Sequence, residues 1–274
     1  MKTVNQFKIG ADPEYIALDK AGLHFNVKGY TTEDKEVAYD HNGDVLEVKP
    51  MPSRYAFRLV RRIRKLLLEH EVSKKLIQEG LKFRGGAYFK IPRRVITMGG
   101  HIHFDIPFAV ENAGVGDNVS TFYLLERNKI RVKRLNEFTK LVESLDILPK
   151  VEAEQRHNYC NNNYSGSMAV RCGNKDNHLE YRAMASWLHS PVAALICLTG
   201  GKLAASHPEI EIDTDLWRYF DKFKGKDTDV ARVCEKIFER KLKLEARLDV
   251  NLLDNWKSIK HLGGLEGDAI SSAL

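Results

Sequence analysis

The sequence predicts an α+β fold in which helices pack on one side of a mainly antiparallel sheet. The apolar segments that read as strands follow one another through turn signals, without the regular helical crossovers that parallel strands require. Three other segments, 53–67, 119–148 and 228–249, repeat apolar residues at the spacing of amphipathic helices. Strands joined by turns, with helices kept apart from them, are typical of the α+β class.

Composition limits the domain organisation. The chain has 274 residues, of which 43% are hydrophobic, so it can bury a core of ordinary size. We expect one domain over residues 1–274. Its strand-forming motifs lie in 7–188, a helical part follows in 189–260, and the tail 261–274 is expected to be poorly ordered.

Sequence features also indicate the compartment. No segment approaches the roughly 18 apolar residues that a membrane span needs, and the N-terminus lacks the apolar region of a signal peptide. The four cysteines are dispersed without a C-x-x-C spacing, which favours free thiols in a reducing cytoplasm. A bridge between Cys160 and Cys172 stays open at this point.

The first predicted strand, 7–18, carries two carboxylates on one face. Side chains alternate across a strand, so Asp12 and Glu14 share a face with Ile16. Pro13 has no N–H to donate, which indicates an edge, a bulge or a strand start. Carboxylates within an apolar run are costly to bury unless a cation neutralises them, and a divalent ion would do so. A strand end at the surface is the alternative.

A turn at 40–44 leads into a second predicted strand that contains Glu47. The helix 53–67 follows, with Ser53 as its expected N-cap and basic residues on its polar side. This helix holds much of the net charge of +6, and the pI is about 9.0. Its basic side indicates either a solvated surface or attraction of an anionic partner.

The segment 87–96 predicts a hairpin that feeds a strand containing His101 and His103. Two histidines one residue apart place both imidazoles on one strand face. They could bind a metal ion or a phosphate, or they could simply be hydrogen-bonded. Glu180 and Arg182 likewise share a face and could pair with each other. Farther on, Pro191 begins a helix capped by Ser190.

Four motifs occur in the order found in carboxylate–amine ligases of the glutamine synthetase fold, and they resemble most closely the phage-type amidoligases. The motifs are Gly10-Ala11-Asp12-Pro13-Glu14-Tyr15, Glu47 with Lys49-Pro50, Gly99-Gly100-His101-Ile102-His103-Phe104, and Glu180-Tyr181-Arg182 followed by Ser186-Trp187. The resemblance implies a curved antiparallel sheet that holds two or three Mg²⁺ or Mn²⁺ ions against the phosphates of ATP. It also implies an ATP-dependent ligase, cytoplasmic or in the host cytoplasm if phage-encoded, that forms an amide or peptide bond through an acyl phosphate.

The resemblance assigns roles to individual residues. The expected metal ligands are Asp12, Glu14, Glu47, His101 and Glu180. His103 would face the transferred phosphate, Arg182 would steady the phosphoryl group, and Arg171 would be a second phosphate arginine. Lys90 joins these three residues as a nucleotide contact. The chain is shorter than the synthetases and shows no separate N-terminal β-grasp domain, so their ring assembly and their glutamate and ammonia specificity are not carried over.

The chemistry of the residues agrees with this reading. A carboxylate must be activated before an amine can attack it, and moving a γ-phosphoryl group concentrates charge that Mg²⁺ and arginine stabilise. No G-x-x-x-x-G-K-[S/T] motif is present, so side chains and metal ions would have to hold ATP. The expected substrates are a small-molecule or peptide carboxylate and an amine. The sequence identifies neither of them, and the oligomeric state is unknown.

Two other functions stay open from the residues alone. A metal-dependent hydrolase or oxygenase that needs no ATP could use His101, His103 and Glu180. A nucleic-acid-binding protein could use the helix 53–67 together with Lys90, Arg93 and Arg94. Binding of nucleic acid would leave the carboxylates inside apolar strands unexplained, so the ligase is the function we predict.

Overall fold

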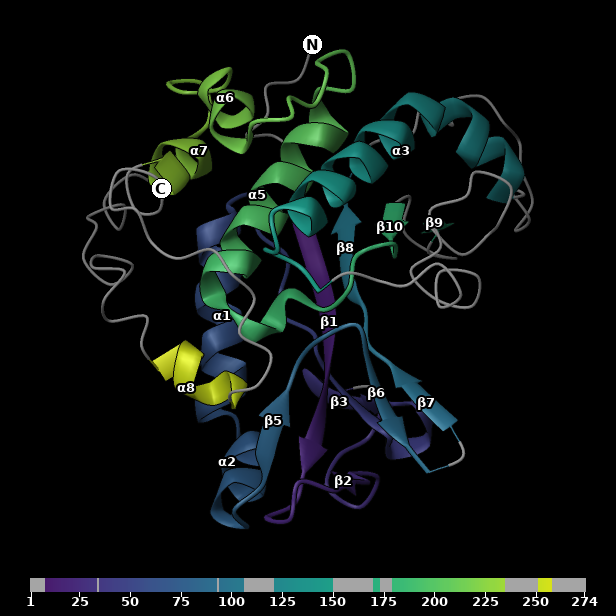
Figure 1. Cartoon of the computed structure of the whole chain (residues 1–274), viewed down its shortest axis with the longest axis vertical. Helices are drawn as coiled ribbons and strands as arrows, with labels where there is room; N and C mark the ends of the chain where they lie inside the picture. The colour runs from purple at the N-terminus through teal and green to yellow at the C-terminus, as the bar shows by residue number, and fades with distance from the viewer. Residues whose placement is uncertain are drawn as a thin grey trace.

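The central strand is β1 (Ile9–Leu18), which pairs on both sides (Figure 1). It belongs to an eight-stranded sheet with the order β3-β4-β1-β8-β10-β9, and β2 and β5 also pair with β1. The other strands are β2 (His24–Phe25), β3 (Val37–Asp40), β4 (Val45–Val48), β5 (Lys82–Arg84), β8 (Gly100–Phe104), β9 (Val170–Cys172) and β10 (Leu179–Tyr181). Every pairing in the described sheet is antiparallel, as the sequence predicts.

This structure is a computed structural model that describes residues 8–33, 35–92, 94–105, 121–149, 170–172, 179–234 and 251–257. Of residues 121–128 and 170–172 it describes the backbone alone. Cys160, Arg93, the tail 261–274 and residues 235–250 of the helix expected over 228–249 lie outside the described residues. Within the described helices, none has the length and apolar character needed to cross a membrane.

One face of the sheet packs against helices. Ile9, Ala11 and Tyr15 on β1 are buried in the same hydrophobic cluster as Ile102 on β8 and Tyr181 on β10. The helices α1 (Ala56–Glu69), α3 (Thr121–Ser144) and α5 (Pro191–Ser206) contribute most of the opposing apolar side chains. The alternation of β1 and the helices on one side confirm the predicted α+β class.

The opposite face of the sheet is divided. At one end Ile16 and Val45 pack with Ile96 and Met98 in a small apolar cluster. That cluster lies beneath a separate hairpin of β6 (Tyr88–Ile91) and β7 (Arg94–Thr97), which confirms the hairpin predicted over 87–96. The remaining part of the face carries polar side chains, so the hairpin limits the polar area to one end of the sheet.

The helix ends confirm one prediction and correct another. Ser190 caps α5 as expected, because its side chain accepts from the backbone of Val192, and Pro191 follows in the first turn. The prediction that Ser53 caps the basic helix is wrong. Helix α1 begins at Ala56, and Ser53 pairs its backbone with Ile9 instead.

The remaining helices are short. They are α2 (Glu71–Gln78), α6 (Leu216–Asp221), α7 (Thr228–Val233) and α8 (Leu252–Lys257), with 3₁₀ turns η2 (His41–Gly43) and η3 (Trp187–His189). The apolar cluster that begins at Ile9 extends to Trp256 on α8. Residues from both ends of the described chain therefore share one core.

Candidate metal-binding site

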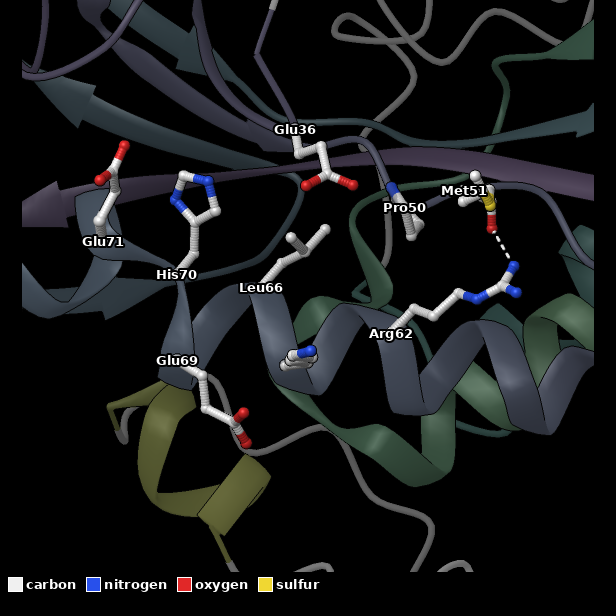
Figure 2. A pocket seen from close by; sticks show the side chains of 9 residues that line it. Glu36, Pro50, Met51, Arg62, Leu66, Glu69, His70 and Glu71 are labelled. Carbon is white, nitrogen blue, oxygen red and sulfur yellow. Dashed lines mark hydrogen bonds between the residues drawn. The ribbon is translucent and has the colours of Figure 1, made fainter.

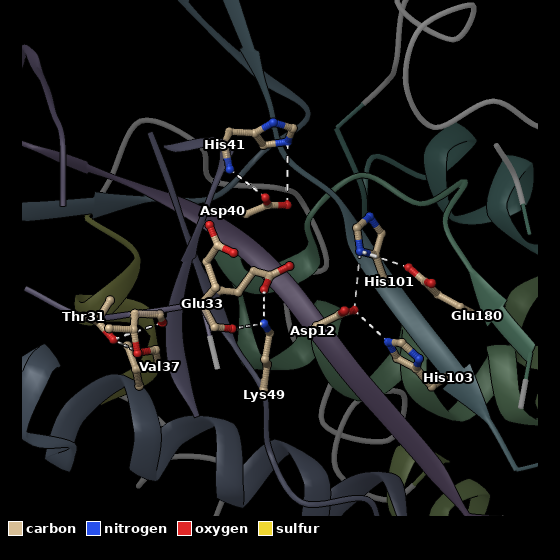
Figure 3. A network of polar contacts seen from close by, with 12 residues as sticks. Asp12, Thr31, Glu33, Val37, Asp40, His41, Lys49, His101, His103 and Glu180 are labelled. Atoms are coloured by element: carbon tan, nitrogen blue, oxygen red, sulfur yellow. Dashed lines mark hydrogen bonds and ion pairs between the residues drawn. The ribbon is translucent and has the colours of Figure 1, made fainter. Parts of the chain in front are cut away.

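Strand register brings the predicted ligands to one face. Asp12 on β1 lies opposite His101 on β8, and Glu14 lies opposite Glu47 on β4. Partners in antiparallel pairs point to the same side of the sheet. We call this polar part of the sheet the acid face, made of Asp12, Glu14, Glu47, His101, His103 and Glu180. Figure 3 labels Asp12, His101, His103 and Glu180 of this group.

Ion pairs connect the acid face across three strands. Asp12 Oδ1 lies 2.9 Å from His103 Nε2 and 3.4 Å from His101 Nδ1. His101 Nδ1 also lies 3.7 Å from Glu180 Oε1, and Arg182 donates to that oxygen at 3.0 Å. In Figure 3 the side chains of Asp12, His101, His103 and Glu180 converge from neighbouring strands. Both His101 and His103 therefore lie next to carboxylates, as ion pairs with Asp12 and, for His101, with Glu180.

Burial and charge shift the pKa values of this group. Burial raises the pKa of Glu47 to about 7, and repulsion from Asp12 adds to the shift although Lys49 pairs with Glu47 at 2.8 Å. Burial alone would lower the pKa of His101, but the carboxylates of Asp12 and Glu14 raise it to about 9. Burial opposes ionisation of Asp12 as well, yet the two imidazoles hold its pKa well below the usual value.

Two triads on the acid face have the geometry of ion sites. Asp12, His101 and Glu180 form one triad, and Glu14, Glu47 and His101 form the other. Within each triad the candidate ligand atoms all lie within 4.8 Å of one another, and His101 is common to both. Four carboxylates lie close together here although Glu14 is 0% and Glu47 6% exposed. An oxygen-rich donor set with one imidazole fits Mg²⁺ or Mn²⁺.

Sequence reasoning missed a third group at the edge of this site. Asp40 and His41 place ligand atoms within 4.8 Å of a Glu14 oxygen, whereas the sequence was interpreted there only as a turn. A signal was available. When strands are paired across that turn, Asp40 falls opposite Val45, two residues from Glu47 and on the same face.

The other predicted residues lie apart from these triads or are only partly described. Lys90 lies on the β6–β7 hairpin with its ammonium 5.8 Å from the centre of the Tyr88 ring. Arg171 lies opposite Glu180 in the β9–β10 pairing, and its side chain is outside the described residues. Arg182 pairs with Glu180, and its predicted role as a phosphate contact stays a prediction.

A separate pocket of about 540 Å³ lies beside α1 rather than on the acid face (Figure 2). Arg62 and Leu66 from α1 line it together with Glu36 and Pro50. None of the residues of the two triads lines this pocket. The pocket and the cluster of candidate metal ligands therefore lie in different places, and only the acid face carries the residues of the two triads.

The fold and the acid face together define a class of protein: an antiparallel sheet with helices packed on one face and, on the other, two groups of carboxylates that share an imidazole and could hold metal ions. Residues 9–143 match the model of the family described as phage phiEco32-like COOH.NH2 ligase-type 2. This match, over just under half of the chain, agrees with the resemblance found in the motifs. The match includes Asp12, Glu14, Glu47 and both histidines. No curated protein gave a significant match.

Solved structures are similar over most of the chain at low identity. A novel glutamine synthase homolog aligns with 13% identity and a TM-score of 0.45, covering 93% of this chain and 71% of that chain. A bifunctional glutathione synthetase from Pasteurella multocida aligns with 13% identity and a TM-score of 0.44, covering 95% and 50%. A GmaS/ADP complex aligns with 12% identity and a TM-score of 0.41, covering 93% and 68%.

Proposed function

We propose that this protein is an ATP-dependent carboxylate–amine ligase that forms an amide or peptide bond through an acyl phosphate. The observation that carries the proposal is the pair of triads that share His101 on the acid face, in a chain that matches this ligase family over residues 9–143. Two ions of a phosphoryl-transfer site typically lie about 3.5 to 4 Å apart. Triads that share one residue are compatible with that spacing.

The chain's own residues divide the work as follows. Asp12, Glu14, Glu47, His101 and Glu180 would hold Mg²⁺ or Mn²⁺, which would supply the charge that neutralises the ATP phosphates. Arg182 lies beside Glu180 at the rim, where its guanidinium can grip phosphoryl oxygens as they gain charge. His103 binds the transferred phosphate, and Arg171 and Lys90 act as further nucleotide contacts.

The reaction then needs two transfers. The γ-phosphoryl group passes from ATP to an oxygen of the substrate carboxylate, and ADP leaves. The neutral amine attacks the acyl carbon, the bond to the phosphate oxygen breaks, and the amine loses a proton. Stabilising the charge on the phosphoryl oxygens is the main contribution of the site. We propose that residues 1–274 form one catalytic domain, supported by the core shared from Ile9 to Trp256.

Contacts of α1 weaken the nucleic-acid alternative. Arg62 donates to the carbonyl oxygens of Met51 and Pro52, and Arg64 Nε donates to Trp256 O at 3.3 Å. Arg58 lies over the ring of Tyr55. Much of the basic side of this helix is therefore used to hold neighbouring segments.

The test is formation of ADP and of an amide by the full-length protein. A panel of amino acids and short peptides is supplied as carboxylates, with hydroxylamine or the panel's own amines as acceptor, and with Mg²⁺ or Mn²⁺. We expect ADP release that depends on both the metal and the carboxylate, together with an equal amount of hydroxamate or amide. Metal-dependent hydrolysis of a substrate without ATP would support the hydrolase alternative and overturn the ligase.

A further inference from the structure

Gly99 and Gly100, at the start of β8 just before His101, are held from the side by the segment 184–187. Gly100 N donates to Met184 O at 2.9 Å, and Ser186 N donates to Met98 O at 3.3 Å. An isolated bridge also pairs Gly99 with Ala185. Gly99 and Gly100 are therefore fixed by a segment more than 80 positions later in the chain.

Trp187 also fixes Gly100 through its side chain. Its indole ring is fully buried, and its Nε1 donates to Gly100 O at 3.1 Å. A Cβ at Gly100 would lie 2.5 Å from Trp187 Cδ1, so only glycine allows the indole to pack at this distance. The two residues are matched in shape as well as by a hydrogen bond.

Gly99 holds Glu14 through two hydrogen bonds. Gly99 N donates to Glu14 Oε2 at 2.6 Å, and Glu14 N donates to Gly99 O at 2.8 Å. Ser186 Oγ donates to the main-chain oxygen of Glu14 at 2.5 Å. Glu14 is thus fixed at its carboxylate through Gly99 and at its backbone through Ser186.

We propose that Ser186 and Trp187 are positioning residues for Glu14. Trp187 fixes Gly100, next to the Gly99 N–H, and Ser186 Oγ fixes the backbone of Glu14. The Gly99 N–H then sets the carboxylate orientation in which a Glu14 oxygen lies within 4.8 Å of ligand atoms of Glu47 and His101. The proposal rests on the proposed function, because it takes Glu14 as a metal ligand. Partners that orient a ligating carboxylate typically contribute about 10- to 100-fold to metal affinity.

The chain offers matched controls for both residues. Trp256 is also fully buried, and it donates its indole N–H to the carbonyl oxygen of Leu188 rather than to that of Gly100. Ser190 Oγ accepts from Val192 N at 3.2 Å and caps α5. Each control has the same side chain in a purely structural setting.

The experiment measures Mn²⁺ affinity of the full-length protein by isothermal titration calorimetry, with the melting temperature recorded for each variant. We expect Trp187→Phe and Ser186→Ala to weaken Mn²⁺ binding about 10- to 100-fold. Trp256→Phe and Ser190→Ala should lower the melting temperature but leave the dissociation constant within about threefold of the wild type. If Trp187→Phe fails to fold, Ser186→Ala, which removes a single hydroxyl, carries the test.

Two results would overturn the proposal. One is wild-type affinity in folded Ser186→Ala and Trp187→Phe. The other is an equal loss of affinity in Trp256→Phe and Ser190→Ala, which would show that general stability controls binding. A wild-type protein that binds no Mn²⁺ would contradict the proposed function itself, and the positioning role would fall with it.

Discussion

Two buried groups of charges in this molecule are balanced in different ways. In the first, Lys202 Nζ lies 2.8 Å from Asp227 Oδ2 and 2.9 Å from Asp229 Oδ2, and all three side chains are buried. Asp229 also accepts from Ala56 N and Phe57 N at the start of α1. The two carboxylates of this first group are balanced by the Lys202 ammonium and by the backbone amides at the start of α1, which are permanent partners.

The acid face is balanced partly by protons. The pKa of His101 is raised to about 9 and that of His103 is also raised, because carboxylates next to them favour the charged imidazoles. Near neutral pH the ring of His101 therefore carries an extra proton that can leave. A divalent cation can replace such a proton, whereas nothing needs to replace Lys202. The difference separates a group of charges that stabilises the fold from one that is suited to bind an ion.

Removing one carboxylate should separate the two groups most clearly. Glu180→Ala deletes an oxygen ligand of the first triad, so we expect metal-dependent turnover to fall about 10⁴-fold, or about 5.5 kcal/mol. The fold should remain intact, because the change also relieves repulsion between carboxylates. Steady-state ADP release and the melting temperature of the same preparation check both points. A variant that keeps turnover above about one tenth of the wild type would contradict the ligand role.

The reverse change should act on stability alone. Lys202→Met leaves two buried carboxylates without their ammonium, which we expect to lower the free energy of unfolding by about 3 to 5 kcal/mol. Urea denaturation measures this loss. Mn²⁺ affinity of the folded fraction should be unchanged.

Lys49→Met is the control for that comparison, because Lys49 is half-exposed and pairs with Glu47 on the acid face. We expect this variant to lose less than about 1 kcal/mol. Equal losses in the two variants would mean that the two groups of charges do not differ as described.

The sequence predicted the elements whose partners are local. Alternation placed Asp12 and Glu14 on one face and Tyr15 on the other, because strand geometry fixes this within a few residues. The Ser190 cap and the 87–96 hairpin were read in the same way. The start of α1 was not, because its amides are bound by Asp229, which is 173 positions away from Ala56.

The candidate site shows the same division. Motif order indicated which carboxylates to choose, and the structure places Asp12, Glu14, Glu47, His101 and Glu180 in two triads. The contribution of Asp40 depended on the register across a turn, and the contacts of Trp187 with Gly100 depended on tertiary packing. The register across the turn can be worked out from the sequence, whereas the packing of Trp187 against Gly100 does not appear in any local pattern.

A milder change at the rim tests whether the acid face handles phosphate. Arg182→Lys keeps the charge beside Glu180 but loses the planar fork, so we expect turnover to fall about 10- to 1000-fold with a small change in nucleotide affinity. A purely structural pair with Glu180 would instead lower the melting temperature and leave turnover per folded molecule unchanged. Full activity in this variant would exclude the phosphate role.

The last predicted effect concerns the proton on His101. Between pH 7 and about 9 the ion-free protein keeps a proton on His101, and the ion-bound protein does not, so binding releases a proton. Mn²⁺ affinity should therefore rise with pH by up to about tenfold per unit and level off above pH 9. The same raised pKa means that the stability contributed by the charged imidazole is present below about 6.5 and is lost as the pH rises through about 9.

Calorimetry in two buffers of different ionisation enthalpy counts the released protons directly. His101→Gln should bind Mn²⁺ more weakly and with a flatter pH dependence, because the proton it would release is absent. His70→Gln is a matched control, since His70 lies at the start of α2, where its Nδ1 accepts from Val72 N. A wild-type affinity independent of pH over this range would mean that permanent partners, as around Lys202, also balance the acid face.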